Sequence, residues 1–171
     1  SNAATGMSWD AKGPKYALDP SLPYKGHFNM LNKHADPKGV KLLLSVGGWA
    51  ETGGYFGEDG KRVASGGFYA LTVDEVTGAV RQDRINTVAK SAAEFVVKYG
   101  LNGIDIDYEY PTSMSDAGSP DDWKIANKHR GKLWDGYMAL MKTLRRELDK
   151  AAAAQGKYYM LTIASPSSGY L

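Results

Sequence analysis

Asn102-Gly-Ile-Asp-Ile-Asp-Tyr-Glu-Tyr-Pro111 is the most informative stretch of this 171-residue chain. Acidic residues alternate in it with apolar or aromatic ones, and a period of two is typical of a β-strand. The carboxylates of Asp105, Asp107 and Glu109 would therefore share one face of the strand. The other face would carry the residues that suit packing against helices: Ile104, Ile106 and Tyr108. We predict a strand over Leu101–Glu109 with one acidic and one apolar face.

The segments around this strand alternate between strand and helix patterns. Lys41-Leu-Leu-Leu-Ser-Val-Gly47 is a nearly continuous apolar run, which favours a strand buried on both faces of a parallel sheet. Tyr158–Ala164 reads as a third strand. Apolar residues recur at helical spacing over Arg81–Tyr99 and from Leu133 to about Ala154, so both segments are predicted helices.

The order of these elements predicts the fold class. A shorter helix is expected over His27–His34, and Gly100 and Gly156 are expected to cap the two longer helices. Helix and strand then alternate three times, which is an α/β arrangement of βαβαβ type with parallel strands and right-handed crossovers.

Three segments lack a regular period and read as loops or irregular chain. They are residues 4–26, Trp49–Gly78, and Pro111 to about Arg130. The last two follow predicted strands, on the face where a β/α barrel places its active site. Loops of this length in compact domains are usually functional or disordered.

Composition excludes several classes of function. The chain is 43% apolar and 23% charged, which suits one sizeable core. Its net charge of +2, without a basic stripe, argues against nucleic acid as a partner. An apolar run of about 18 residues, as a membrane span needs, is absent. The lack of cysteine excludes disulfides, thiolate metal sites and a cysteine nucleophile.

The acidic face predicts acid–base chemistry. Alternate residues of a strand lie about 6.5–7 Å apart, since the rise is about 3.3 Å per residue. Carboxylates this close and partly buried cannot all ionise freely, so at least one is expected to stay protonated near neutral pH. A general acid requires that state. Glu109, at the carboxyl end of the strand and nearest a barrel mouth, is the candidate proton donor.

Two other interpretations of the acidic face stay open. The alternation also fits a solvated edge strand of an antiparallel sheet, although the flanking helices favour a buried parallel strand. Carboxylates on one strand are also ligands that magnesium or calcium accepts. No further oxygen-ligand motif accompanies them, so we expect neither a metal nor another cofactor.

Residues 102–111 resemble the signature strand of family 18 glycoside hydrolases, whose pattern is Asp-Gly-x-Asp-x-Asp-x-Glu. Ser45-Val-Gly-Gly-Trp49 resembles the Ser-x-Gly-Gly motif of the same family, and the two motifs occur in the family's order. The resemblance covers roughly residues 38–171. It implies a (β/α)8 TIM barrel, of which the strands found here would be about the third to the fifth.

The resemblance also sets expectations for the extent of the chain. A whole barrel takes about 250 residues, and the Met-x-Tyr-Asp motif of the family's sixth strand is absent from this sequence. We therefore expect residues 4–171 to be part of one catalytic domain, and Ser1-Asn2-Ala3 to be the remnant of an expression tag. A partial barrel leaves sheet edges open, so we expect this piece to associate with a copy of itself or to depend on further chain.

The resemblance implies a role for each carboxylate. Glu109 would protonate the glycosidic oxygen, Asp107 would orient and stabilise the substrate's N-acetyl group, and Asp105 would share a proton with Asp107. The nucleophile would be the acetamido oxygen of the sugar, giving substrate-assisted hydrolysis with retention. The implied reaction cuts β-1,4 bonds in chitin or N-acetylglucosamine oligosaccharides.

Substrate-binding residues also follow from the resemblance. Gly47, Gly48 and Trp49 match a stretch that lines the family's cleft, and Tyr110 matches a position that contacts the sugar. Aromatic side chains offer flat apolar faces to pyranose rings, although each of them fits loop packing equally well. The aromatic candidates for subsite walls are Trp49, Tyr55, Phe56 and Phe68.

Three residues depart from the family pattern. Asn102 replaces the first Asp of the signature, at the end of the strand far from the chemistry, so we expect a structural effect. Tyr108 stands where Trp is frequent, on the outward face. Ala50 takes a place where chitinases often carry Asn, which removes one sugar contact.

Alternatives within and beyond this mechanism stay open. An endo-β-N-acetylglucosaminidase acting on N-glycans is the nearest rival, and the long loops would distinguish the two. A chitin-binding lectin would normally lack the catalytic Glu, which is present here as Glu109. A chitinase-fold subunit of a larger assembly is a further option. The expected partners are chitin or its oligosaccharides, without nucleic acid or membrane, and the resemblance implies a secreted enzyme.

Overall fold

The structure is a computed structural model of the chain. It describes residue 21 and residues 26–63, 66–111, 115–116 and 119–165. The expected tag remnant, Ser1–Ala3, lies outside the described residues, as does most of the irregular segment 4–26.

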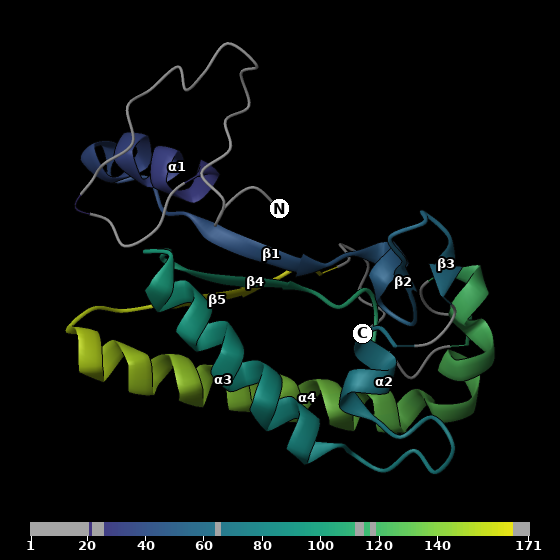
Figure 1. The fold of residues 1–171 in the computed structure, drawn as a ribbon. Helices are drawn as coiled ribbons and strands as arrows, with labels where there is room; N and C mark the ends of the chain where they lie inside the picture. Colours follow the sequence, from purple (N-terminus) through teal and green to yellow (C-terminus); the bar gives the residue numbers. More distant parts are fainter. Residues whose placement is uncertain (1–20, 22–25, 64–65, 112–114, 117–118, 166–171) are drawn as a thin grey trace.

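A parallel sheet of three strands forms the centre of the described fold (Figure 1). Its strand order is β1 (Leu43–Gly47), β4 (Gly103–Asp107) and β5 (Met160–Ile163). Both neighbours run parallel to β4. This confirms the predicted βαβαβ order, and it contradicts the solvated edge strand, since β4 is paired on both sides.

Two long helices cover one face of this sheet (Figure 1). They are α3 (Gln82–Lys98) and α4 (Trp123–Gln155). The buried residues of α3 follow one stripe with helical spacing: Ile85, Ala89, Ala93 and Val96. Gly100 and Gly156, both with φ of 65°, end the helices in the left-handed conformation as expected.

A third helix, α1 (His27–Ala35), lies near the amino end of the sheet and continues into the 3-10 turn η1 (Asp36–Lys38). The Phe28 ring meets the Phe95 and Tyr99 rings of the α3 end at centroid distances of 5.9 and 5.4 Å. Aromatic packing therefore attaches α1 to the rest of the fold.

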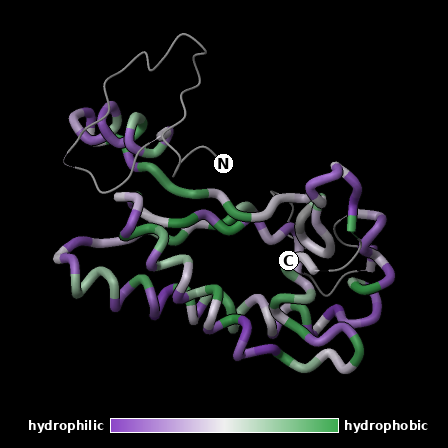
Figure 2. Tube along the Cα trace, in the orientation of Figure 1, coloured by the Kyte–Doolittle hydropathy of each residue, from purple (hydrophilic) through white to green (hydrophobic). Residues whose placement is uncertain are grey.

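The core lies between the apolar face of β4 and the helices. Ile104, Ile106 and Tyr108 are only 3%, 3% and 2% exposed, as the alternation predicted. Hydrophobic residues run along β1, whereas α3 and α4 mix polar and apolar positions (Figure 2). Among the helices of the described part, none is long and apolar enough to cross a membrane.

The strand β1 is less buried than its sequence indicated. Ser45 and Gly47 are exposed, and the apolar residues between and before them are half-buried. In the described residues β1 is an edge of the sheet, paired with β4 alone. The prediction of a strand buried on both faces was therefore wrong.

Both segments read as loops contain regular structure. Residues 49–72 form the 3-10 turn η2 (Trp49–Glu51), a small hairpin of β2 (Tyr55–Phe56) and β3 (Arg62–Val63), and the short helix α2 (Phe68–Thr72). Their glycine-rich composition concealed these elements.

The last helix also begins earlier than expected. The 3-10 turn η3 (Pro120–Asp122) leads directly into α4 at Trp123, well before the predicted start at Leu133. His129 has non-helical φ and ψ of −122° and 18°, so two helical pieces meet there at a kink. The first piece is mostly polar, which is why its sequence resembled a loop.

Candidate active site

The two strand carboxylates each accept a hydrogen bond from a neighbouring strand. The Ser45 hydroxyl of β1 donates to Oδ2 of Asp107 at 2.5 Å, and the Thr162 hydroxyl of β5 donates to Oδ1 of Asp105 at 2.5 Å. Both carboxylates are half-buried on the face of β4 opposite the core. Hydrogen bonds to an ionised group are stronger than neutral ones, so these donors compensate for the lost hydration of the acids.

The strand register explains this arrangement. In the parallel pairing, Asp105 lies opposite Ser45 on one side and Thr162 on the other. The hydroxyl groups therefore meet the acidic face of β4 from both sides. The predicted proton exchange between Asp105 and Asp107 stays a prediction, since the hydrogen bonds found here go to Ser45 and Thr162 instead.

Glu109 lies just beyond the end of β4 and is half-buried. Its backbone N–H donates to the Thr52 hydroxyl at 3.1 Å. The peptide bond between Glu109 and Tyr110 is cis. The position two residues after β4 and the contact with Thr52 place Glu109 at the carboxyl end of the sheet, beside the loop that follows β1.

Tyr110 lies against the candidate acid. A hydrogen bond with the Glu109 side chain raises the pKa of the Tyr110 hydroxyl, and slight burial and the negative charges of Glu109 and Asp107 raise it further. The Tyr110 ring also meets the Trp49 ring edge-on, with centroids 6.4 Å apart. Trp49 is 48% exposed, so an aromatic surface open to solvent borders the acid.

Gly47 and Gly48, of the Ser-x-Gly-Gly motif, allow the backbone after β1 to approach the end of β4 closely. A Cβ on Gly47, at φ of 101°, would lie 2.3 Å from the Phe68 ring and 2.7 Å from the Asp107 carbonyl oxygen. Gly48 N–H donates to that same oxygen at 2.8 Å. These contacts join the ends of β1 and β4, and the predicted sugar contacts of Gly47 and Gly48 stay predictions.

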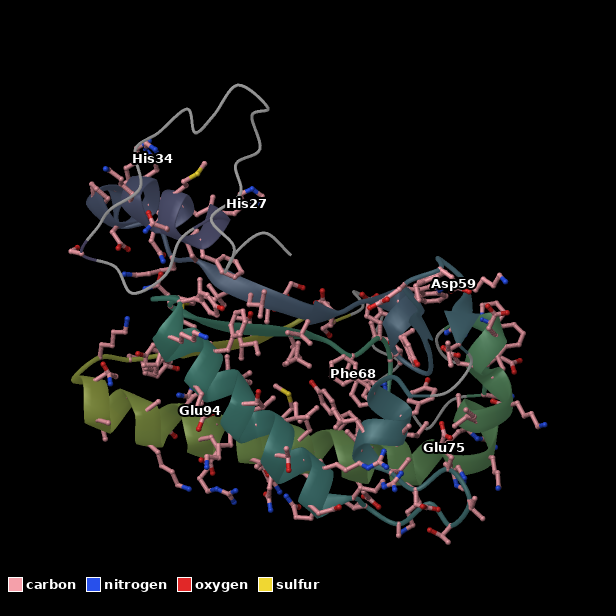
Figure 3. The ribbon with its side chains drawn as sticks, in the orientation of Figure 1. His27, His34, Asp59, Phe68, Glu75 and Glu94 are labelled. Atoms are coloured by element: carbon pink, nitrogen blue, oxygen red, sulfur yellow. The ribbon has the colours of Figure 1, made fainter. Side chains whose placement is uncertain are left out.

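The other aromatic candidates divide into two groups. Tyr55 and Phe56, on the hairpin, are 42% and 52% exposed and remain candidates for a subsite wall. Phe68, the first residue of α2, is buried and stacks on Tyr108 with centroids 4.8 Å apart, on the side of α2 that faces the sheet (Figure 3). The prediction that Phe68 forms a subsite wall was therefore wrong. Its ring packs in the interior of the protein instead.

Sequence reasoning missed two residues of this site. Thr162 is the polar residue within an otherwise apolar strand. It lies opposite Asp105 in the register, and the alternation of side chains along β5 could have predicted that it shares the acidic face of β4. Thr52 gave no signal, because its role depends on a contact with a residue 57 positions away. Within the described ranges, no cluster of three or more His, Cys, Asp or Glu residues has a geometry that could hold a metal ion.

Carboxylates at and near the carboxyl end of a parallel strand occupy the face of the sheet where β/α-barrel enzymes place their active sites. The chain belongs to the glycosyl hydrolases family 18, whose family model matches residues 5–170. This confirms the resemblance inferred from the two motifs.

Individual relatives agree with this assignment. Chitinase A1 of Niallia circulans is 34% identical over 166 residues, which are 95% of this chain and 20% of that protein. A solved family 18 chitinase from Chromobacterium violaceum is 56% identical with a TM-score of 0.85, over 96% of this chain and 24% of its own. A family 18 N-acetylglucosaminidase from Paenibacillus barengoltzii is 28% identical with a TM-score of 0.51, over 82% of this chain and 32% of its own. The fold is thus part of a β/α barrel, and the chain spans about a quarter or less of the two chitinases.

Proposed function

We propose that the protein to which this chain belongs hydrolyses β-1,4 bonds in chitin or N-acetylglucosamine oligosaccharides, with Glu109 as the general acid. The observation that carries the proposal is the row of carboxylates along β4, which leads from Asp105 through Asp107 to Glu109 at the carboxyl end of the sheet. Membership of the glycosyl hydrolases family 18 supports it.

The proposed reaction gives each group one task. Glu109 donates its proton to the glycosidic oxygen as the bond from that oxygen to the anomeric carbon breaks. The acetamido oxygen of the same sugar attacks the anomeric carbon and forms a cyclic oxazolinium ion. Water then attacks that carbon as its bond to the acetamido oxygen breaks, which restores the acetamido group, and one proton of the water passes to the Glu109 carboxylate. The acid is restored, and the configuration is retained.

Asp107 and Asp105 would act on the acetamido group and its charge. The intermediate is positively charged, and an ionised Asp107 would stabilise it and orient the amide N–H. The Ser45 hydroxyl donates a hydrogen bond to Asp107, and the Thr162 hydroxyl donates one to Asp105. Asp105 would share a proton with Asp107, as the family resemblance implies.

The proposed substrate class follows from the nucleophile. A sugar without a 2-acetamido group lacks the attacking oxygen, so N-acetylglucosamine is required at the cleavage position. Tyr110 contacts Glu109 and Trp49 contacts Tyr110, and the two rings would provide aromatic surface for a pyranose ring. We propose Gly47 and Gly48 as further lining of this cleft.

The test uses the whole protein and fluorogenic N-acetylglucosamine oligosaccharides. Glu109→Gln should lower kcat by at least about 100-fold, since general acid catalysis contributes about 10²–10⁴. Glu94→Gln is the matched control, because Glu94 is exposed on α3 away from the site (Figure 3). Full activity in Glu109→Gln would contradict the proposal.

The same experiment separates the alternatives. A folded protein that binds chitin oligosaccharides but never cleaves them is a lectin, which would replace the enzyme assignment. Cleavage of N-glycans from a glycoprotein in preference to chitin oligosaccharides would identify an endo-β-N-acetylglucosaminidase.

We also propose that the whole protein is secreted, because chitin is an insoluble polymer that does not enter cells. Expression of the native gene, followed by activity assays of the culture medium and the cell fraction, tests this. Activity confined to the cell fraction would contradict it.

A further inference from the structure

Thr52 connects the segment after β1, the segment after β4 that carries Glu109, and the helix α2. The residue is fully buried, at 0% exposure. Its hydroxyl donates to the Gly48 carbonyl at 3.2 Å and accepts the hydrogen bond from Glu109 N–H at 3.1 Å. Its carbonyl accepts from Tyr69 N–H, in α2, at 2.9 Å. Because the hydroxyl proton is directed to Gly48, a lone pair of the same oxygen is directed to Glu109.

A buried ion pair holds the loop on both sides of Thr52. Nη2 of Arg62 lies 2.7 and 2.8 Å from the two carboxylate oxygens of Asp122, which is 0% exposed. Asp122 accepts from Gly53 N–H at 3.1 Å, and Arg62 donates to the Ala50 carbonyl at 3.1 Å. Gly53 follows Thr52 directly and Ala50 precedes it by two positions, so the pair fixes the backbone of this turn.

The packing around this pair leaves little freedom. A Cβ on Gly53 would lie 2.4 Å from Cγ of Asp122, so glycine is needed for the approach. The pair joins β3 to the turn η3 that starts α4, and the hairpin and the start of α4 lie close together in the structure (Figure 1). The loops after β1 and β4 are therefore fixed to each other.

Neither Thr52 nor Asp122 is placed to touch a substrate. Both side chains are completely buried, whereas the aromatic surface beside Glu109 is exposed through Trp49. Any influence of Thr52 on the reaction must therefore pass through the backbone of Glu109.

We propose that Thr52 is a positioning residue for Glu109, and that the Arg62–Asp122 pair holds Thr52 in place. The inference rests on the proposed role of Glu109 as the general acid. The direction of the Glu109 side chain depends on its backbone, and a displacement of about 1 Å at a catalytic group lowers rates by about 100-fold.

The first test compares Thr52→Val with Thr52→Ser in the whole protein. Valine keeps the shape but removes the hydroxyl, so kcat per folded molecule should fall by about tenfold or more with little change in KM. Serine retains the hydroxyl and should restore most of the activity. If Val and Ser behave alike, or if only the amount of folded protein changes, the positioning role is refuted.

A double-mutant cycle separates this inference from the proposed function. In the Glu109→Gln background, Thr52→Val should cause no further loss of kcat, because the residue acts through Glu109. A further loss as large as in the wild type would contradict the inference while leaving Glu109 as the acid. Full activity of Glu109→Gln alone would instead overturn the proposed function itself.

The role of the ion pair is tested with a paired substitution, because removal of one buried partner alone endangers folding. Arg62→Met combined with Asp122→Leu removes both charges and the acceptor for Gly53, and should lower kcat with little effect on KM. Asp59→Asn is the control, since Asp59 forms an exposed pair with Lys61 in the same hairpin (Figure 3). Unchanged kcat in the folded double variant would refute the role of the pair.

Discussion

Ser45 and Asp107 lie 62 positions apart in the chain, yet the Ser45 hydroxyl donates a hydrogen bond of 2.5 Å to the Asp107 carboxylate. Thr162 and Asp105 are joined in the same way over 57 positions. Asp105 and Asp107 therefore accept their hydrogen bonds from two different neighbouring strands. The geometry of the site is a property of the sheet and not of the signature strand alone.

Removal of the Ser45 hydroxyl should impair the reaction. A hydrogen bond to a charged group contributes about 1.5–3 kcal/mol, so Ser45→Ala should lower kcat by about tenfold to 100-fold in the whole protein. The measurement is steady-state kinetics on an N-acetylglucosamine oligosaccharide. Ser91→Ala, at an exposed position of α3, is the control. Equal kcat in both variants would contradict the role of Ser45.

Tyr110 should titrate at higher pH than an ordinary tyrosine. Its hydroxyl shares a hydrogen bond with Glu109, and the nearby negative charges disfavour the phenolate, so the pKa of Tyr110 is raised above its usual value of about 10. Glu109→Gln removes the charge and should lower this pKa. NMR of ring-labelled tyrosine, with Tyr110→Phe to assign the signal, measures the change. An unchanged midpoint in Glu109→Gln would disprove the contact.

Replacement of Tyr69 by Phe should stabilise the protein. Tyr69 is 0% exposed, and its hydroxyl has no hydrogen-bond partner among the described residues. Burial and the charge of Asp122 raise the pKa of Tyr69, so the hydroxyl stays neutral, and its burial without a partner costs free energy. Tyr69→Phe should raise the free energy of unfolding by about 1 kcal/mol in urea denaturation. Tyr158→Phe, at a 70% exposed site where the hydroxyl accepts only a long hydrogen bond of 3.4 Å from Arg145, should change this free energy by less than about 0.5 kcal/mol. A loss of stability in Tyr69→Phe would reveal a hidden partner.

Substitution of alanine for Gly131 and for Gly136, both in α4, should change the stability of the protein in opposite directions. In a helix interior, alanine is favoured over glycine by about 1 kcal/mol. A Cβ on Gly131 would meet nothing within 4 Å, so Gly131→Ala should be stabilising. A Cβ on Gly136 would lie 2.9 Å from Thr72 and Val73, and such overpacking costs about 1–3 kcal/mol. Gly136→Ala should therefore be destabilising in thermal unfolding. Stabilisation of similar size in both variants would contradict this packing of α2 on α4.

The 171-residue chain should self-associate. Within the described residues, β1 and β5 each pair on one side only, and apolar side chains of β1 line an open groove with α3. Open strand edges and apolar grooves favour association between chains. Sedimentation velocity over a range of concentrations measures this. A stable, strictly monomeric species at all concentrations would contradict it.

The features that the sequence predicted correctly are those encoded in local patterns. The alternation of residues 104–108 placed the apolar side chains in the core, and the glycines Gly100 and Gly156 marked helix ends. The substitution at Asn102 was expected to be structural, and its side-chain oxygen accepts a hydrogen bond from Leu42 N–H at 2.8 Å. In each case a few neighbouring residues determine the outcome.

What the sequence did not predict depends on contacts between distant residues. The helix α2 exists because Phe68 and Tyr69 pack on Tyr108, at ring distances of 4.8 and 5.8 Å. The pairing of Arg62 with Asp122 spans 60 positions, and neither residue belongs to a recognisable motif. Such interactions have no periodicity, so pattern analysis gives no sign of them.

Asn102 holds both neighbours of β4 at the end of the sheet opposite the carboxylates. It exchanges hydrogen bonds with Leu42 through its own N–H and its side-chain oxygen, at 2.7 and 2.8 Å, and its carbonyl accepts from Met160 N–H at 2.8 Å. Strand alignment is thus anchored at one end of the sheet, and Glu109, the proposed acid, lies at the other. An exchanged loop at that other end would therefore leave Asp105 and Asp107 aligned, whereas Glu109 would keep its place only if the segment that carries Thr52 were retained.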